Sequence, residues 1–448
     1  MPRLRYGTNE QGRVSVVSSL RAPRLNRIPP LATHVVGSYP ANPDYREEMR
    51  VFHNTVSIET LKGETQELLE NPVEFFMLNH PAQEKKEMML EEIMQIAPIL
   101  RATRTAIEAQ ICARIDIITD GQTITNMINY VTDRLANVRH HRRPVVLSQP
   151  ARKFPLLQVD LLCLKALSVV EVSGFVPDWG LAAVALQAST CMRLCPRNLK
   201  ELEQAVKTIS RGLQREIEGM PVGIRSRVPM FKACIAGPYT VSLSVDDRRK
   251  GLSQSERVYE FAGLINEELK RVSDLHLADI VQIDEPFLSE NWYEDYREVS
   301  LKLIDEVALP RAVHICGRIH KSIPEIISLP FDILDHEFAS YPEQLDELLK
   351  YSFEQGIGLG VVRSDSNRIE QPKEIAEKIL YAAEKIDAGR IFPDPDCGLR
   401  NLLPASANGK LVNLVEGTKL ARKTLIGCKN TDKSNGSGLG STLKNNEE

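Results

Sequence analysis

Short runs of apolar and β-branched residues alternate along most of this chain with longer segments of helical periodicity. Residues 255–277 and 371–386 repeat apolar positions with the spacing of a helix that buries one face. The apolar runs between such segments have the length of strands that are buried on both faces. They predict eight strands, at residues 33–39, 115–119, 231–236, 279–284, 311–316, 331–335, 356–362 and 390–394.

Eight strands that alternate with helices favour an α/β fold, a parallel (β/α)8 TIM barrel, over an open sheet. Two connections are too long for simple crossovers, which predicts helical insertions after strands 1 and 2, near residues 55–105 and 131–225. We therefore expect three parts, namely an N-terminal extension (1–30), a barrel with insertions (31–425) and a polar, Gly/Ser-containing disordered tail (426–448).

Composition narrows the class of protein. The chain is 42% hydrophobic and 26% charged, with a formal net charge of −4, so no excess of positive charge favours nucleic acid. No apolar run approaches the roughly 20 residues that span a membrane, and the N-terminus lacks the apolar segment of a secretory signal. Eight cysteines spread over 448 residues indicate a reducing compartment. We expect a cytoplasmic protein in which a conspicuous cysteine is catalytic or bound to metal.

Polar residues with metal-binding chemistry follow several predicted strands, where a barrel has its active site. His314 and Cys316 end the fifth strand, two positions apart, so they point to the same side. Glu337 follows the sixth strand and Cys397 the eighth. Sulfur, nitrogen and oxygen donors suit Zn²⁺, whereas thiolates argue against Mg²⁺ or Ca²⁺. The absence of paired Cys-x-x-Cys motifs favours a catalytic zinc with an exchangeable ligand.

Structural roles for the same residues stay open at this point. His314 and Cys316 could be packed core side chains, Cys397 a turn residue and Glu337 the partner of a cation. His336 could be a ligand itself or a hydrogen-bond donor to one. Zinc held by two thiolates, one imidazole and one carboxylate would carry a net charge near −1. Such a site favours alkylation of a bound thiolate over activation of a carbonyl.

Seven motifs in order resemble the catalytic domain of cobalamin-independent methionine synthase: VVGSYP, IITDGQ, CIAGPYT, QIDEP, VHICG, LDHEFA and PDPDCGL. The resemblance runs over residues 33–400, apart from the two insertions. It implies a barrel in which His314, Cys316, Glu337 and Cys397 hold one zinc ion, which activates homocysteine for methyl transfer. It also implies that Ser38 and the backbone of Val36 bind the carboxylate of homocysteine, while Asp284 binds its ammonium group.

Two positions differ from the family pattern. Gln122 replaces a glutamate that also binds the ammonium group, which gives up a charge interaction on the order of 1–3 kcal/mol. The segment GPYTVSLSV lacks the tryptophan that stacks on folate, and the chain lacks the family's second barrel-like domain. We therefore predict a methylcorrinoid donor, with a corrinoid protein as a possible partner at the basic segments 134–143 and 246–251.

Three functions follow. The first is zinc-dependent methyl transfer to homocysteine, forming methionine, without nucleic acid or membrane. The second is the same zinc chemistry on another thiol, such as coenzyme M. The third is a non-catalytic barrel with structural zinc.

Overall fold

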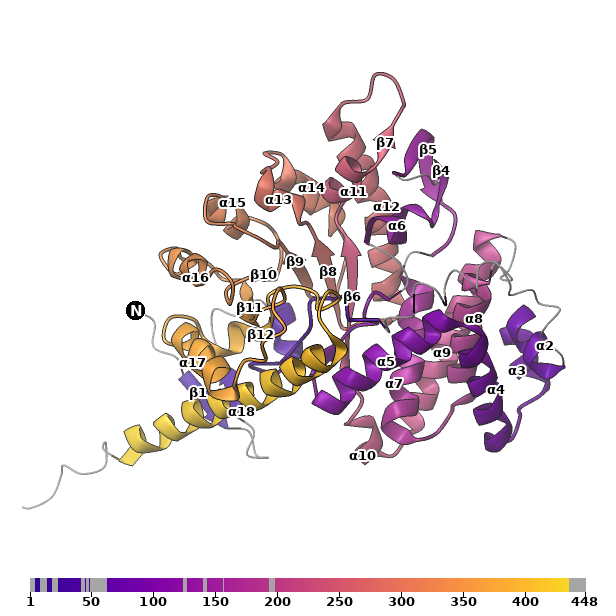
Figure 1. Cartoon of the computed structure of the whole chain (residues 1–448), viewed down its shortest axis with the longest axis horizontal. Helices are drawn as coiled ribbons and strands as arrows, with labels where there is room; N and C mark the ends of the chain where they lie inside the picture. The colour runs from indigo at the N-terminus through magenta and orange to yellow at the C-terminus, as the bar shows by residue number, and fades with distance from the viewer. Residues whose placement is uncertain are drawn as a thin grey trace, which may run out of the picture.

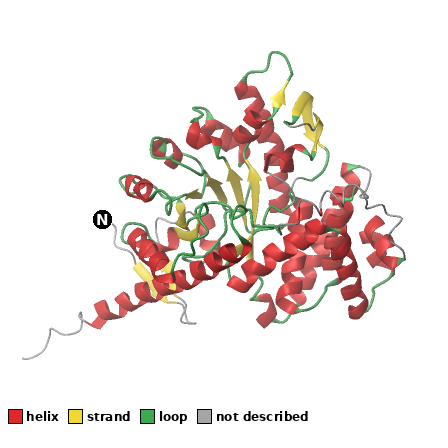
Figure 2. Ribbon diagram, viewed as in Figure 1, coloured by secondary structure: helices red, strands yellow, loops and turns green. Residues whose placement is uncertain are grey.

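A curled parallel sheet of seven strands lies at the centre of the protein, surrounded by helices (Figures 1 and 2). The structure is a computed structural model that describes residues 5–8, 14–17, 23–41, 45, 48, 63–123, 127–139, 143–155, 157–192 and 198–434. In sheet order the strands are β12 (Ile391–Pro395), β11 (Gly356–Val362), β10 (Ile333–His336), β9 (Arg311–His314), β8 (Ile280–Asp284), β6 (Met230–Ala236) and β3 (Ile117–Ile118).

The predicted first strand closes this sheet into a barrel, although it is far shorter than predicted. Only His34 forms a bridge, parallel to Ile117 of β3, while its N–H donates to the carbonyl of Pro393 in β12 at 3.1 Å. After His34, the backbone carbonyls accept hydrogen bonds from side chains and not from a neighbouring strand. Gln282 and Cys234 donate to the carbonyl of Val36, and Thr119 donates to that of Gly37. The segment 33–39 is thus an eighth position in the barrel rather than a full strand.

The N-terminal ends of the strands are sealed by a small apolar cluster. Its members come from the turn η1 (Pro23–Arg27), the residues after it and the first or second residue of five strands: Leu25, Ile28, Ala32, Ile117, Ile280, Ala312, Ile333 and Phe392. These side chains are at most 4% exposed. Burial of this set closes one end of the barrel and leaves the opposite end for polar side chains.

Helices cover the outside of the barrel. The long helix α18 packs against both α17 and α5, and so covers the region where the sheet closes (Figure 1). The helices after β6 are α11 (Pro238–Ser244), α12 (Gln254–Asp274), α13 (Phe287–Glu290), α14 (Tyr296–Leu303), α15 (Ile323–Ile327), α16 (Pro342–Leu348), α17 (Pro372–Ala383) and α18 (Pro404–Ser434), with the turn η3 (Ala388–Arg390) before β12. The periodic segments 255–277 and 371–386 correspond to α12 and α17.

The two insertions form a helical layer on one side of the barrel (Figure 1). The first contains α2 (Glu64–Glu70), α3 (Pro72–Leu78), α4 (Gln83–Ile96) and leads into α5 (Pro98–Ala113). The second contains α6 (Met127–Thr132), α7 (Gln158–Ser173), α8 (Asp178–Cys191), α9 (Leu199–Gly219) and α10 (Val222–Arg225). Helix α8 is apolar around most of its circumference because α3, α4, α7 and α9 all pack against it. The prediction of an α/β barrel with helical insertions is confirmed.

Smaller sheets and the chain ends complete the description. Strands β4 (Leu135–Arg139), β5 (Val145–Arg152) and β7 (Asp246–Asp247) form a three-stranded sheet, and β1 (Arg5–Thr8) pairs with β2 (Val14–Val17). Helix α18 continues to Ser434, past the predicted domain end at 425, and no proline after Pro404 interrupts it. Residues 435–448 of the predicted disordered tail lie outside the described residues. None of the described helices is long and apolar enough to cross a membrane.

Candidate metal and substrate site at the barrel mouth

All eight site residues predicted from the sequence lie at the carboxyl ends of the strands. Asp284 and His314 are the last residues of β8 and β9, and they are paired in register. Cys316, Glu337 and Cys397 follow β9, β10 and β12 within two residues. The remaining three lie in the barrel-closing segment 33–39, after its bridge at His34, or in the turn after β3: Val36, Ser38 and Gln122.

Three soft donors converge at this end of the barrel. The donor atoms of His314, Cys316 and Cys397 all lie within 4.8 Å of one another. The His314 ring is buried, and its Nε2 has no hydrogen-bond partner in the described part of the chain. A hydrogen bond with Cys316 and burial raise the pKa of the Cys397 thiol well above its usual range. An unpartnered imidazole nitrogen beside two thiols offers three of the four donors that a tetrahedral Zn²⁺ site needs.

Glu337 lies at the edge of this group. Its carboxylate is not among the donor atoms that share the 4.8 Å group. Burial, then the nearby Asp396, raise the pKa of Glu337, while His314 and a hydrogen bond from the backbone of Gly317 oppose that shift. The structure thus brings three of the four predicted ligands together and holds Glu337 next to them, as the first residue after β10.

A second set of polar groups lies beside the donors. Gln282 donates through Nε2 to the carbonyl of Val36 and to Oδ1 of Asp284, both at 2.7 Å. Gln122 donates to Oδ2 of Asp284 at 3.4 Å. Burial raises the pKa of Asp284 to about 6. Asp284 is therefore a buried carboxylate whose hydrogen bonds come from two neutral amides, which leaves its charge for an incoming cation.

Two glycines, Gly398 and Gly121, shape the surroundings of Ser38. The carbonyl of Ser38 accepts from the N–H of Leu399 at 2.7 Å, which places it beside the loop that carries Cys397. A Cβ on Gly398 would lie 2.0 Å from Ser38 Oγ, so only glycine leaves space for this hydroxyl. Gly121, with φ of +74°, turns the chain after β3 so that its carbonyl accepts from Tyr39 at 2.9 Å.

Sequence reasoning missed a buried polar group deeper in the barrel. The donor atoms of His34, Asp335 and Asp394 also lie within 4.8 Å of one another, and all three residues are at most 5% exposed. Lys232 Nζ contacts His34 Nδ1 at 2.9 Å and supplies positive charge to this group. The only signal in the sequence was a polar residue inside an otherwise apolar run, and such runs do not say which strands meet.

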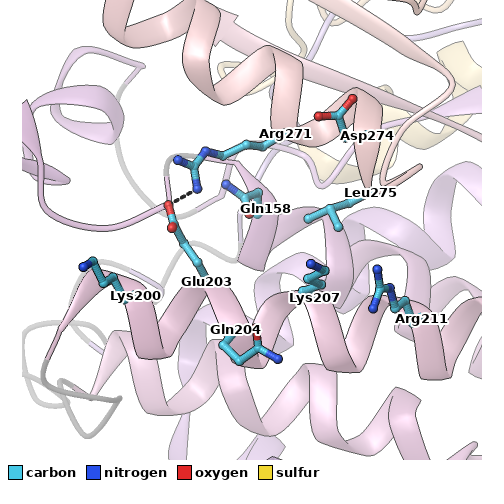
Figure 3. A pocket seen from close by; sticks show the side chains of 9 residues that line it. All are labelled: Gln158, Lys200, Glu203, Gln204, Lys207, Arg211, Arg271, Asp274 and Leu275. Atoms are coloured by element: carbon cyan, nitrogen blue, oxygen red, sulfur yellow. Dashed lines mark ion pairs between the residues drawn. The ribbon is translucent and has the colours of Figure 1, made fainter.

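A small cavity lies next to this site, and a larger cleft lies elsewhere on the protein. A small cavity is lined by residues of α6, of β6 and of the turn after β3: Asp120, Gln122, Met127, Tyr130, Cys234, Ile235 and Ala236. A larger cleft lies between α9 and α12, where Arg271 pairs with Glu203 (Figure 3). None of the predicted site residues lines the larger cleft.

Comparisons with known proteins agree with this arrangement. Residues 207–420 match the family described as the catalytic domain of cobalamin-independent synthase. That region contains Asp284, His314, Cys316, Glu337 and Cys397. A methionine synthase from Methanocaldococcus jannaschii is 27% identical over 366 residues, covering 77% of this chain and 97% of the relative. One from Methanothermobacter thermautotrophicus is 32% identical over 193 residues, and the match covers 41% of this chain and 61% of that relative.

Solved structures show the same fold. A B12-independent methionine synthase from Shewanella sp. W3-18-1, solved in complex with selenomethionine, has a TM-score of 0.56 at 18% identity, over 89% of this chain and all of its own. A B12-independent methionine synthase, described as putative, from Listeria monocytogenes has a TM-score of 0.53 at 14% identity, over 87% of this chain and 97% of its own. At these sequence identities, the structural similarity shows only that the barrel fold is shared.

One expectation finds no support in these comparisons. Neither the family nor the relatives supports the predicted methylcorrinoid donor or a corrinoid protein partner. The prediction rested on two expectations from the sequence, the lack of a tryptophan after Gly-Pro-x-Thr and the lack of the family's second barrel-like domain. Both argue against folate, but neither by itself favours a corrinoid. Residues 207–420, a little under half of the chain, thus match the catalytic domain of the cobalamin-independent methionine synthase family, in agreement with the ordered motifs and the barrel.

Proposed function

We propose that this protein is a zinc-dependent methyltransferase that transfers a methyl group to the thiol of homocysteine and so forms methionine. The observation that carries the proposal is the convergence of His314, Cys316 and Cys397 within 4.8 Å at the carboxyl ends of the barrel strands. Ser38 and Asp284, which suit the two charged ends of an amino acid, lie at the same end of the barrel. We place the activity in the cytoplasm, where both cysteines stay reduced.

The donor set fits one zinc ion. His314 offers a buried Nε2 without a partner, and the two thiols lie next to it. In the proposal Glu337 supplies the fourth ligand, since it follows the strand adjacent to that of His314. When bound, Zn²⁺ supplies the Lewis acidity that keeps an incoming thiol deprotonated near neutral pH.

The neighbouring residues orient the amino acid. Asp284 pairs with the ammonium group of homocysteine, and its 4% exposure keeps water from screening that pair. Ser38 and the backbone at Val36 donate to the carboxylate. Gln122 positions Asp284 through its amide. These contacts hold the sulfur of the substrate toward the two cysteines and away from solvent, which is the chain's own contribution to the rate.

The first test measures metal content. The purified protein is expected to contain about one zinc per chain, and Cys316→Ser or Cys397→Ser is expected to reduce it to below about 0.2, because each substitution removes a thiolate ligand. Cys112→Ser is the matched control, since Cys112 is an exposed free cysteine outside the donor group. A folded wild-type protein that binds no zinc after incubation with the metal would refute the proposed site.

The second test measures methyl transfer with two thiols and two donors. Homocysteine and coenzyme M are each combined with methylcobalamin or methyl-tetrahydrofolate. We expect methionine to form, and the donor that works identifies the donor class. Transfer to coenzyme M alone would assign the enzyme to another thiol. No transfer to either thiol by a zinc-loaded protein would leave a non-catalytic barrel with structural zinc and end the proposal.

A further inference from the structure

The His314 ring is held from behind by a carboxylate of the neighbouring strand. Nδ1 of His314 lies 3.0 Å from Oδ1 of Asp335, and their backbones are paired in register between β9 and β10. His314 is 2% exposed and Asp335 is 0% exposed, so water does not compete for this hydrogen bond. With Nδ1 donating to Asp335, Nε2 is the ring nitrogen left to bind a metal, and it is the atom that lacks a hydrogen-bond partner in the described part of the chain.

The barrel leaves space for this carboxylate by means of one glycine. Asp335 is paired in register with Gly358 of β11. A Cβ on Gly358 would lie 2.6 Å from Asp335 Cγ and 2.7 Å from Asp335 Cβ, closer than side chains pack. Any larger residue at 358 would therefore push Asp335 out of its position. The Asp335 side chain occupies the space that a side chain at position 358 of β11 would otherwise fill.

Neighbouring groups compensate for the buried charge of Asp335. The interaction with His314, followed by smaller contributions from His34 and Lys232, outweighs burial and keeps the pKa of Asp335 below its usual range. Lys232 is itself fixed by contacts with His34 and Gln282. The charge of Asp335 is therefore compensated by neighbouring protein groups and not by solvent.

We propose that Asp335 is a positioning residue, which fixes the tautomer and orientation of His314 so that Nε2 joins Cys316 and Cys397 in binding a thiophilic divalent cation. Gly358 is the space that makes this arrangement possible. The inference rests on the proposed zinc site and extends it to residues behind the ligands. Carboxylates that hold a ligating histidine in this way typically contribute 10–100-fold to metal affinity.

The test compares the zinc affinity of metal-free wild-type protein and Asp335→Asn by competition with a chromophoric chelator. An amide cannot orient and polarise the ring as a carboxylate does, so the dissociation constant for Zn²⁺ is expected to rise about 10–100-fold. With saturating Co²⁺, the thiolate-to-metal charge-transfer band is expected to persist because both cysteines remain, while the d–d bands shift with the altered imidazole.

Asp394→Asn is the matched control. Asp394 belongs to the same buried group, but no hydrogen bond joins it to His314. Burial and the charge of Asp335 raise the pKa of Asp394 well above its usual range. An amide at this position keeps the shape of the side chain. The zinc affinity of Asp394→Asn is expected to stay within about threefold of wild type.

The outcomes separate this inference from the proposed function. Zinc binding by Asp335→Asn with wild-type affinity overturns the positioning role and leaves the zinc site standing. An equal loss in Asp335→Asn and Asp394→Asn also overturns it, because the effect then belongs to the buried charges as a group. Failure of wild type to bind zinc overturns both. If Asp335→Asn does not fold, Gly358→Ala, which keeps the charge but displaces it, is expected to show the same loss.

Discussion

At the scale of single residues, the environment of Gln122 separates this site from the family pattern. Gln122 has a φ of +45° and follows Gly121 in the turn after β3, which directs its amide at Asp284. The Cβ position of Gly37 lies 3.0 Å from the carbon of that amide, so the side chain is confined between two barrel positions. A neutral amide in a confined position near a buried carboxylate binds a cation less strongly than a second carboxylate would.

Gln122→Glu is therefore expected to lower the KM for homocysteine about tenfold, because the ammonium group gains a charged partner. The KM for coenzyme M, a thiol without an ammonium group, is expected to stay the same or to rise. Steady-state kinetics with both thiols measure the difference. An equal change in both KM values would show that residue 122 affects the pocket in general and does not contact the ammonium group.

At the scale of elements, local sequence sets where the helices around the barrel begin. Helix α12 starts with a capping box, in which Ser253 Oγ accepts from the N–H of Glu256 and the carboxylate of Glu256 accepts from the N–H of Ser253 at 2.8 Å. Without these two hydrogen bonds, the backbone N–H groups of Ser253 and Glu256 would lack partners, because the first turn of a helix has no intrahelical acceptors for them. The apolar residues of α12 then follow with helical spacing and pack onto the barrel.

Ser253→Ala is expected to lower the free energy of unfolding by about 1 kcal/mol, since it removes the acceptor of the capping box. Ser255→Ala is the matched control in the same turn, because Ser255 makes no side-chain hydrogen bond in the described part of the chain, and its effect is expected to stay within about 0.5 kcal/mol. Urea unfolding followed by circular dichroism measures both. Equal losses would show that the cap contributes no more than side-chain burial.

At the scale of the whole molecule, the barrel has an apolar end and a polar interior above it. The cluster around Leu25 and Phe392 closes the N-terminal ends of the strands. Above it lies the group of His34, Lys232, Asp335 and Asp394, and the soft donors follow at the mouth. Burying such a polar group is costly unless its members satisfy one another, so the stability of the barrel depends on their protonation.

His34 gives this dependence a direction. Burial, then the charge of Lys232, lower the pKa of His34 to about 3. Between about pH 3 and 6.5 the unfolded chain binds a proton at this position that the folded protein does not, so stability is present above pH 6.5 and is lost as the pH falls. One proton contributes a slope of about 1.4 kcal/mol per pH unit.

The unfolding free energy of wild type is therefore expected to fall more steeply between pH 6 and 4 than that of His34→Gln, by up to that slope. Urea unfolding at intervals of half a pH unit measures both curves. The comparison needs only the difference in slope, so a general loss of stability in the variant does not affect it. Parallel curves would contradict the neutral state of His34.

The sequence by itself determined the alternation of strands and helices, the two insertions and the polar residues that end each strand. These depend on local periodicity and on chain order, which one sequence contains in full. The structure confirmed the barrel and the insertions, and it placed three of the four expected ligands, His314, Cys316 and Cys397, within 4.8 Å of one another. It corrected the length of the first strand, whose carbonyls are bound by side chains from distant segments.

Only the tertiary structure decided which side chains meet across strands. The contact between Asp335 and His314 depends on the register of β9 against β10, and the space for Asp335 depends on the register of β10 against β11. The pairing of Ser38 with the Gly398 loop depends on closure of the barrel. Register and closure arise from the packing of the whole interior, so no local pattern around these residues contains them.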